Sequence, residues 1–148
     1  DYSEAIRLDP EFTLAYNNRG IAYDKLGEYE LAIEDYSEAI RLDPQFALAY
    51  FNRGGSYLDL GEYEHAIGDY SEAIRLDPRD ADAYFERALA HSHLKQYELA
   101  IEDFSKTIQL RPQDGDAYQL RGLINQILGR NTKADSDFKK AEELGFTQ

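Results

Sequence analysis

Small and apolar residues recur along the chain at steps of three and four, the spacing that places them on one side of an α-helix. In one such stretch the recurring residues are Ala49, Tyr50, Gly54, Tyr57 and Leu60. In the next stretch they are Ala66, Tyr70, Ala73 and Ile74. Each stretch predicts an amphipathic helix with one apolar side, which a single helix cannot bury by itself.

Glycine and proline separate these predicted helices. Gly27, Gly61 and Gly129 each follow an apolar-periodic stretch, and glycine adopts the left-handed conformation that ends a helix at little cost. Pro78 cannot continue the helix before it and disfavours α geometry at Asp77. The sequence therefore predicts an alternation of helices and short turns.

The same segments return at a fixed period. Prolines at positions 10, 44, 78 and 112 are each 34 residues apart. The decamer DYSEAIRLDP occupies residues 1–10, 35–44 and 69–78, and it has diverged to DFSKTIQLRP at 103–112. Such a period predicts identical helix pairs that bury their apolar sides against one another by stacking.

A 34-residue helical unit with these small, aromatic and proline positions resembles the tetratricopeptide repeat (TPR). In the second unit the signature positions are Tyr50, Gly54, Tyr57, Ala66, Tyr70, Ala73 and Pro78. The resemblance implies an all-α fold, a right-handed superhelix or α-solenoid of stacked antiparallel helix pairs whose first helices line a groove. Departures from the pattern fall late in the chain, at Ala88, His91, Lys95, Asn125 and Phe146.

The repeat register predicts a single TPR domain over residues 1–148. Residues 1–12 form the second helix of a partial repeat, and four full repeats follow at 13–46, 47–80, 81–114 and 115–148. The sequence has no Met, even at position 1, so we expect it to be part of a longer protein.

The resemblance implies a peptide-binding groove along the first helices. Its candidate residues are Leu14, Asn17, Asn18, Ile21, Phe46, Leu48, Phe51, Asn52, Leu58, Phe85, Leu89 and Leu123. Apolar and aromatic residues on such a face indicate an interaction site, although they could instead fill the inner curve of the superhelix. The three asparagines could hydrogen-bond the main chain of an extended peptide, or they could simply be solvated.

Charged residues also recur with the period. An arginine stands in the middle of the packing side of each first helix, and an aspartate stands at the edge of the buried side of each second helix. The set comprises Arg19, Arg53, Arg87, Arg121, Asp35, Asp69, Asp103 and Asp137. Because a buried charge without a partner is costly, we predict a structural ladder of Arg–Asp ion pairs.

One TPR subclass clamps the C-terminal carboxylate of chaperone tails with Lys, Asn and Arg on successive first helices. The corresponding places here are Asn17, Ile21, Asn52, Asp82 and Glu86, of which only Asn52 matches. The resemblance therefore argues against an anionic C-terminal tail as the ligand.

The sequence offers no constellation for chemistry. His91 and His93 point about 200° apart on a helix and cannot share a metal ion. Acidic neighbours such as Glu34 and Asp35 lie on regular repeating helices, so we predict no catalytic residue, no metal and no cofactor. The chain has no Cys, which leaves the compartment open, and we expect the cytoplasm.

The net charge of −13 narrows the class of partner. Residues 1–80 hold 7 Lys/Arg and 18 Asp/Glu (net −11), whereas residues 81–148 hold 9 and 11 (net −2). Such acidity excludes nucleic acid, and no apolar run of about 18 residues could insert in a membrane. A protein or peptide partner should be apolar or aromatic and not acidic.

The leading hypothesis is a non-catalytic protein-interaction module that binds a peptide in its groove. A second hypothesis is a self-assembling scaffold, in which exposed terminal helices stack head to tail. Its contact residues would be Tyr2, Ala5, Ile6 and Leu8 at one end, and Phe138, Ala141 and Leu144 at the other. A third hypothesis is a recruitment domain of a larger enzyme.

Overall fold

A computed structural model of the chain describes residues 2–146, and these residues form helices joined by short turns, with no β-strand among them. The helices are α1 (Tyr2–Leu8), α2 (Thr13–Leu26), α3 (Tyr29–Leu42), α4 (Ala47–Asp59), α5 (Tyr63–Leu76), α6 (Ala81–His93), α7 (Tyr97–Leu110), α8 (Gly115–Ile127) and α9 (Asn131–Glu143). The predicted all-α fold is confirmed.

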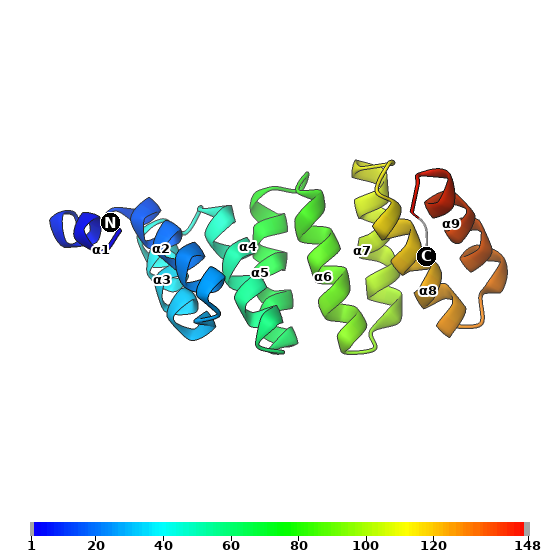
Figure 1. Cartoon of the computed structure of the whole chain (residues 1–148), viewed down its shortest axis with the longest axis horizontal. Coiled ribbons are helices and arrows are strands. Elements are labelled where there is room, and N and C mark those ends of the chain that lie inside the picture. The colour runs from blue at the N-terminus through cyan, green and yellow to red at the C-terminus, as the bar shows by residue number, and fades with distance from the viewer. Residues whose placement is uncertain (1, 147–148) are drawn as a thin grey trace. The chain divides into compact units, whose positions relative to one another are not determined.

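The chain divides into two compact units, Asp1–Pro78 and Arg79–Gln148. In the first unit α2 pairs with α3 and α4 with α5, while α3 also packs against α4 and α1 against α2 (Figure 1). In the second unit α6 pairs with α7 and α8 with α9, and α7 packs against α8. Each unit is therefore a stack of helix pairs, as the repeat predicted.

The turn between the two helices of a pair requires a left-handed residue. Gly27, Gly61 and Gly129 have φ angles of 77°, 77° and 71°, which confirms the prediction for these glycines. Lys95 takes the same place in the third repeat with φ 58°, a conformation that costs a side-chain-bearing residue more than it costs glycine.

The core of each pair is a ring packed on a residue without a bulky side chain. A Cβ added at Gly20 would lie 2.7 Å from the Tyr36 ring, and one added at Gly122 would lie 2.6 Å from the Phe138 ring. In the third repeat, where Ala88 replaces this glycine, Ala88 and Phe104 are both fully buried in one cluster. Small residues thus determine how closely the two helices approach.

The final helix covers its apolar residues more fully than the sequence predicted. Ala141 is buried, and Phe138 and Leu144 are half-buried. The exposed positions of α9 include Asp135 and Lys139, so its outer face is polar. The apolar end surface expected at α9 is therefore small, whereas Tyr2 and Leu8 on α1 are exposed.

Candidate peptide-binding surface

Each first helix is tied to its partner helix by a two-point ion pair. The Nε and Nη2 atoms of the arginine donate to the two carboxylate oxygens of an aspartate 16 residues later, at 2.6–2.9 Å. The pairs are Arg19–Asp35, Arg53–Asp69, Arg87–Asp103 and Arg121–Asp137. The geometry is the bidentate one that gives an arginine–carboxylate pair its strength and its orientation.

A serine on the preceding second helix joins these pairs. Arg53 Nη1 donates to Ser37 Oγ at 2.9 Å, and Arg121 Nη1 donates to Ser105 Oγ at 2.9 Å. In the first repeat the Arg19–Ser3 distance is 3.3 Å. Arg19, Arg53 and Arg121 therefore each link three consecutive helices. The serine was not predicted to take part, although it returns in every DYSEAIRLDP copy of the sequence.

Aromatic rings enclose the same arginines. The guanidinium carbon of Arg53 lies 5.8 Å from the centre of the Tyr50 ring and 6.0 Å from that of Tyr57. Hydrogen bonding to Asp69 raises the pKa of Arg53 above its usual value, and desolvation opposes this shift. The guanidinium groups are held by the aspartates and the tyrosine rings, so they are not available to a ligand of the groove.

In the first unit, some of the expected groove residues are exposed and others are half-buried against neighbouring side chains. Leu14 on α2 and Leu48 on α4 are 51% and 49% exposed, and they occupy equivalent positions in successive repeats. Phe51 is half-buried, and its ring meets Tyr70 edge-on with the ring centres 5.7 Å apart. The remaining half-buried residues are Asn18, Ile21, Phe46, Asn52 and Leu58.

The structure buries one expected groove residue. Asn17 is only 1% exposed, and its Oδ1 accepts a hydrogen bond from Asn52 Nδ2 at 3.0 Å. This bond joins α2 to α4, so the Asn17 side chain is not available to a peptide, contrary to the sequence expectation. The reason is the side-by-side packing of two first helices, which a helical wheel of one helix cannot represent.

A second polar connection between α2 and α4 is centred on Asp24. Its carboxylate accepts from Tyr36 Oη at 2.6 Å and from Ser56 Oγ at 2.7 Å. Burial, and then the hydrogen bond to Asp24, raise the pKa of the Tyr36 hydroxyl well above its usual range. The network holds α2 and α4 in register near their C-terminal ends.

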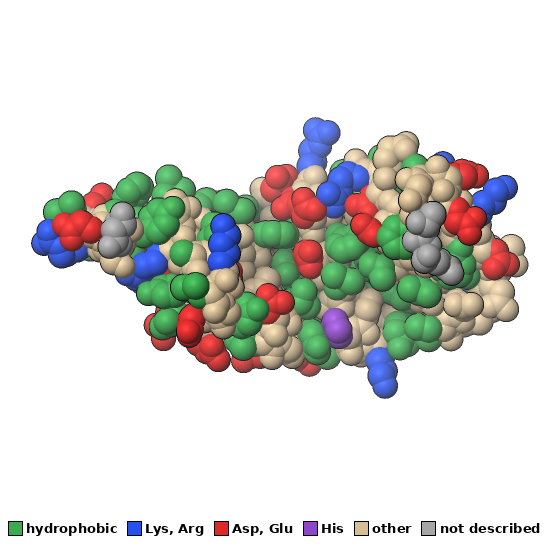
Figure 2. All heavy atoms as spheres, in the orientation of Figure 1, with side chains coloured by type: hydrophobic (Ala, Val, Ile, Leu, Met, Phe, Trp, Pro, Cys, Tyr) green, Lys and Arg blue, Asp and Glu red, His purple; other side chains and the backbone are tan. Residues whose placement is uncertain are grey.

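In the second unit, the aromatic groove candidate belongs mainly to the core. Phe85 packs edge-on against Phe104, with ring centres 5.4 Å apart, and Leu89 packs against the same cluster. On the first helices of this unit, the exposed large apolar residues are instead Leu123, 40% exposed, and Ile127, 63% exposed, both on α8. Hydrophobic side chains are visible among acidic ones on the viewed face of each unit (Figure 2).

Next to Phe85 lies a small acidic pocket of about 210 Å³. Its charged lining residues are Asp82, Glu86, Arg111, Asp114 and Asp116. Arg111 Nη2 lies 2.8 Å from Asp82 and 3.5 Å from Asp114, which leaves an excess of negative charge. The pocket therefore favours a neutral or basic ligand group.

Sequence profiles of the tetratricopeptide repeat match residues 13–46, 55–125 and 115–144. The chain belongs to the TPR family. TPR domains are non-enzymatic scaffolds for protein interaction, and this chain is such a protein-interaction module. Its first profile match begins at Thr13, where α2 begins.

Solved TPR structures agree with this assignment. A crystal structure of MamA superposes with a TM-score of 0.95 at 31% identity, covering 97% of this chain and 84% of MamA. MamA 41-end from Desulfovibrio magneticus RS-1 gives 0.92 at 26% identity, covering 97% and 81%. The first TPR of Spaghetti (RPAP3), bound to the HSP90 peptide SRMEEVD, gives 0.77 at 28% identity, covering 79% and 93%. The fold is that of a TPR α-solenoid.

The part of the chain that the structure describes holds neither a group of metal ligands nor a membrane-spanning helix. Within residues 2–146, no three His, Asp or Glu side chains are grouped as a metal site would require. The Nδ1 atom of the buried His91 lies 2.7 Å from Gln96 Oε1, while His93 is exposed. None of the described helices combines the length and apolar character needed to cross a membrane.

Proposed function

We propose that this TPR module binds a peptide segment along the first helices of its repeats and holds it mainly by apolar contacts. The observation that carries the proposal is the exposure of Leu14 and Leu48, apolar residues at equivalent positions of α2 and α4. Two half-exposed leucines in register offer an extended or helical segment successive contacts at the spacing of the repeat. Burying them would stabilise the complex.

Anchored aromatic residues beside these leucines support the proposal. The edge-on contact with Tyr70 restricts the Phe51 ring before any ligand arrives. A rigid ring loses little conformational entropy on binding, so its contact area contributes more to affinity than that of a mobile side chain. We expect Phe51 to orient the ligand and Leu14 and Leu48 to supply the surface that binding buries.

The charges favour a partner that is apolar or aromatic and neutral or basic. The acidic pocket beside Phe85 suits a Lys or Arg side chain of such a partner. Where the carboxylate-clamping TPR subclass carries cations, this chain has Asn17, Asp82 and Glu86. We therefore do not expect the groove to take an acidic peptide of the kind bound in the RPAP3 structure.

The test is a selection of peptide ligands on the intact chain, followed by affinity measurements on two matched leucine variants. Leu14→Ser with Leu48→Ser changes the proposed surface, whereas Leu31→Ser changes an exposed leucine on the second helix α3. We expect the double variant to weaken binding about tenfold or more, and Leu31→Ser to leave it unchanged. Equal losses in both variants, or none in the double variant, would disprove the proposal.

A further inference from the structure

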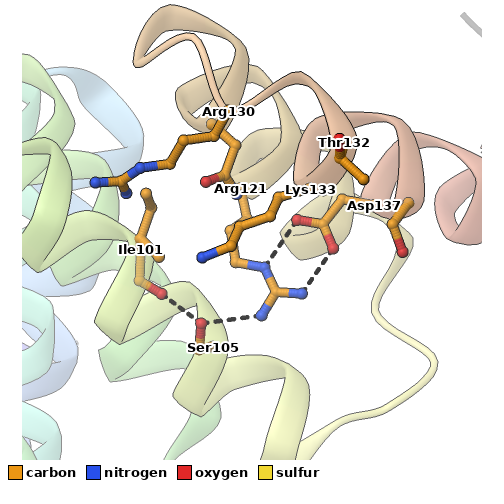
Figure 3. Close-up of a pocket in the computed structure, with 9 residues that line it drawn as sticks. Ile101, Ser105, Arg121, Arg130, Thr132, Lys133 and Asp137 are labelled. Atoms are coloured by element: carbon orange, nitrogen blue, oxygen red, sulfur yellow. Dashed lines mark hydrogen bonds and ion pairs between the residues drawn. The ribbon is translucent and has the colours of Figure 1, made fainter.

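A polar pocket of about 500 Å³ lies between α7, α8 and α9 (Figure 3). The residues that matter here are Ser105 of α7, Arg121 and Asn125 of α8, and Arg130, Lys133 and Ser136 at and after the start of α9. In Figure 3 the side chains of Arg121, Arg130 and Lys133 extend toward the α7 residues. The volume is within the range of about 300–1,000 Å³ that is typical of ligand sites.

This pocket is separate from the proposed groove. Asn125 follows the exposed groove residue Leu123 by two positions, which places the two side chains about 200° apart around α8. The pocket lies on the side of the second helices α7 and α9, and the groove residues lie on the first helices. A ligand could therefore occupy the pocket while a peptide occupies the groove.

The pocket exists because the last repeat lacks a ring side chain that the first three repeats carry at the equivalent position. The position of Asn125 is occupied by Tyr23, Tyr57 and His91 in the first three repeats. The Tyr57 ring lies against His65 with the ring centres 5.0 Å apart, and His91 bonds to Gln96. Asn125 is too short to fill this space. It is only 3% exposed, and its Oδ1 has no hydrogen-bond partner among the described residues.

The residues at the edge of the pocket are also more positively charged than the equivalent residues of the first three repeats. Arg130 stands where the first three repeats carry Glu28, Glu62 and Gln96. Lys133 stands where they carry Leu31, His65 and Leu99. Thr132 stands where they carry Glu30, Glu64 and Glu98. In a chain of net charge −13, the lining now holds the cations of Arg121, Arg130 and Lys133 against the single carboxylate of Asp137.

Two of these cations are accessible to a ligand. Arg121 is held by Asp137, but Lys133 forms no ion pair with any residue from 2 to 146. Arg130 lies 2.7 Å from Glu98 in a solvent-exposed pair, and such a pair is weak enough for an incoming anion to share the arginine. The helix α9 begins here with no side chain capping its first turn, and the positive end of its dipole also favours an anion.

We propose that this pocket binds an acidic peptide segment, whose anionic oxygen group is held by Arg130 and Lys133 and whose main-chain N–H donates to Asn125 Oδ1. The anionic group is a carboxylate or a phosphate carried by a side chain. The unpaired Oδ1 favours a peptide, because this acceptor requires a donor. A deprotonated carboxylate or a fully ionised phosphate ester has none, whereas a peptide main chain supplies its N–H. The site stands beside the proposed groove function and does not depend on it.

The experiment titrates the full chain with three capped, fluorescently labelled peptides, Gly-Glu-Glu-Gly, its Gln-for-Glu counterpart and its phosphoserine counterpart. One variant combines Arg130→Gln with Lys133→Leu, the residues that the third repeat carries at these positions. A second, Asn125→Tyr, restores the ring of the first two repeats. Leu48→Ser in the groove is the matched control, and thermal unfolding of every variant verifies its fold. NMR follows the Asn125 side-chain amide during each titration.

We expect the Glu or phosphoserine peptide to bind and to shift the Asn125 amide signals, and the tighter of the two identifies the natural group. Both pocket variants should weaken this binding about tenfold or more, while the Gln peptide binds weakly and Leu48→Ser has no effect. Equal binding of Glu and Gln peptides, or unchanged binding by the folded pocket variants, would overturn the proposal. Inorganic phosphate that shifts the Asn125 signals as strongly as the peptides would overturn the assignment to a peptide.

Discussion

Arg53 and Asp69 face each other across α4 and α5, with the Nε and Nη2 atoms each 2.7 Å from a carboxylate oxygen. The arginine side chain is 20% exposed and the aspartate side chain 9% exposed, so the pair is largely removed from water. The same relationship recurs in every repeat and makes the pair the main polar connection between the two helices of a unit. Its removal is the most direct test of how the repeats are held together.

Asp69→Asn should lower the free energy of unfolding by about 2–4 kcal/mol, because Arg53 would keep its charge without a counterion. Urea unfolding measures this. The exposed pair Arg75–Glu72 is the control, and Arg75→Gln should leave the unfolding transition almost unchanged. An Asp69→Asn protein as stable as the wild type would show that water solvates Arg53 well enough to replace the pair.

Gly20→Ala should destabilise the first unit by about 1–3 kcal/mol, although alanine is the better helix former. The added Cβ would lie 2.7 Å from the Tyr36 ring, so α2 and α3 would have to separate. Gly68→Ala is the matched control in a helix, because nothing lies within 4 Å of its Cβ position. We expect Gly68→Ala to raise the unfolding temperature and Gly20→Ala to lower it.

Tyr36→Phe should cost about 1 kcal/mol near neutral pH, since Asp24 loses a buried donor. Phe104 and Phe138 occupy the same repeat position, so the ring itself fits. The pKa of Tyr36 is raised in the folded state, so its contribution is complete below the ordinary tyrosine pKa of 10.0 and is lost as the pH rises above it. The difference between wild type and variant, measured by denaturant unfolding, should therefore shrink above about pH 10. A gap that widens there would contradict this sign.

Phe85→Ala and Leu123→Ala should differ in their effect on stability, because Phe85 belongs to the core of the second unit and Leu123 to its exposed surface. Phe85 packs on Phe104, so its loss should cost about 2–4 kcal/mol of unfolding free energy. Leu123 is 40% exposed, so its loss should cost less than about 1 kcal/mol. Chemical unfolding of both variants tests this, and a Leu123→Ala protein as unstable as Phe85→Ala would place Leu123 in the core.

Much of the fold could be predicted from local pattern. The steps of three and four define which side of each helix is apolar, and the 34-residue period requires those sides to stack. Gly27 and Gly61 mark the left-handed turns because few other residues adopt that conformation cheaply. The Arg–Asp pairing could also be predicted from the sequence, since both residues recur on faces that must be buried.

The candidate sites depended on distances between helices that no single-helix pattern contains. Asn17 sits on the expected arc of α2, yet the approach of α4 buries it against Asn52. Phe85 looked like a free anchor, yet its position over Phe104 makes it part of the core.

The sequence by itself determined the helices, their turns and the repeated faces, because hydrophobic periodicity and backbone preference act over a few residues. Only the tertiary structure decided which of those residues a ligand could reach. The clearest case is Asn125, a single shorter side chain that opens a pocket among three helices and leaves its own oxygen unpaired. Side-chain volume at a helix junction is a non-local quantity, since it depends on what every neighbouring helix brings to the same space.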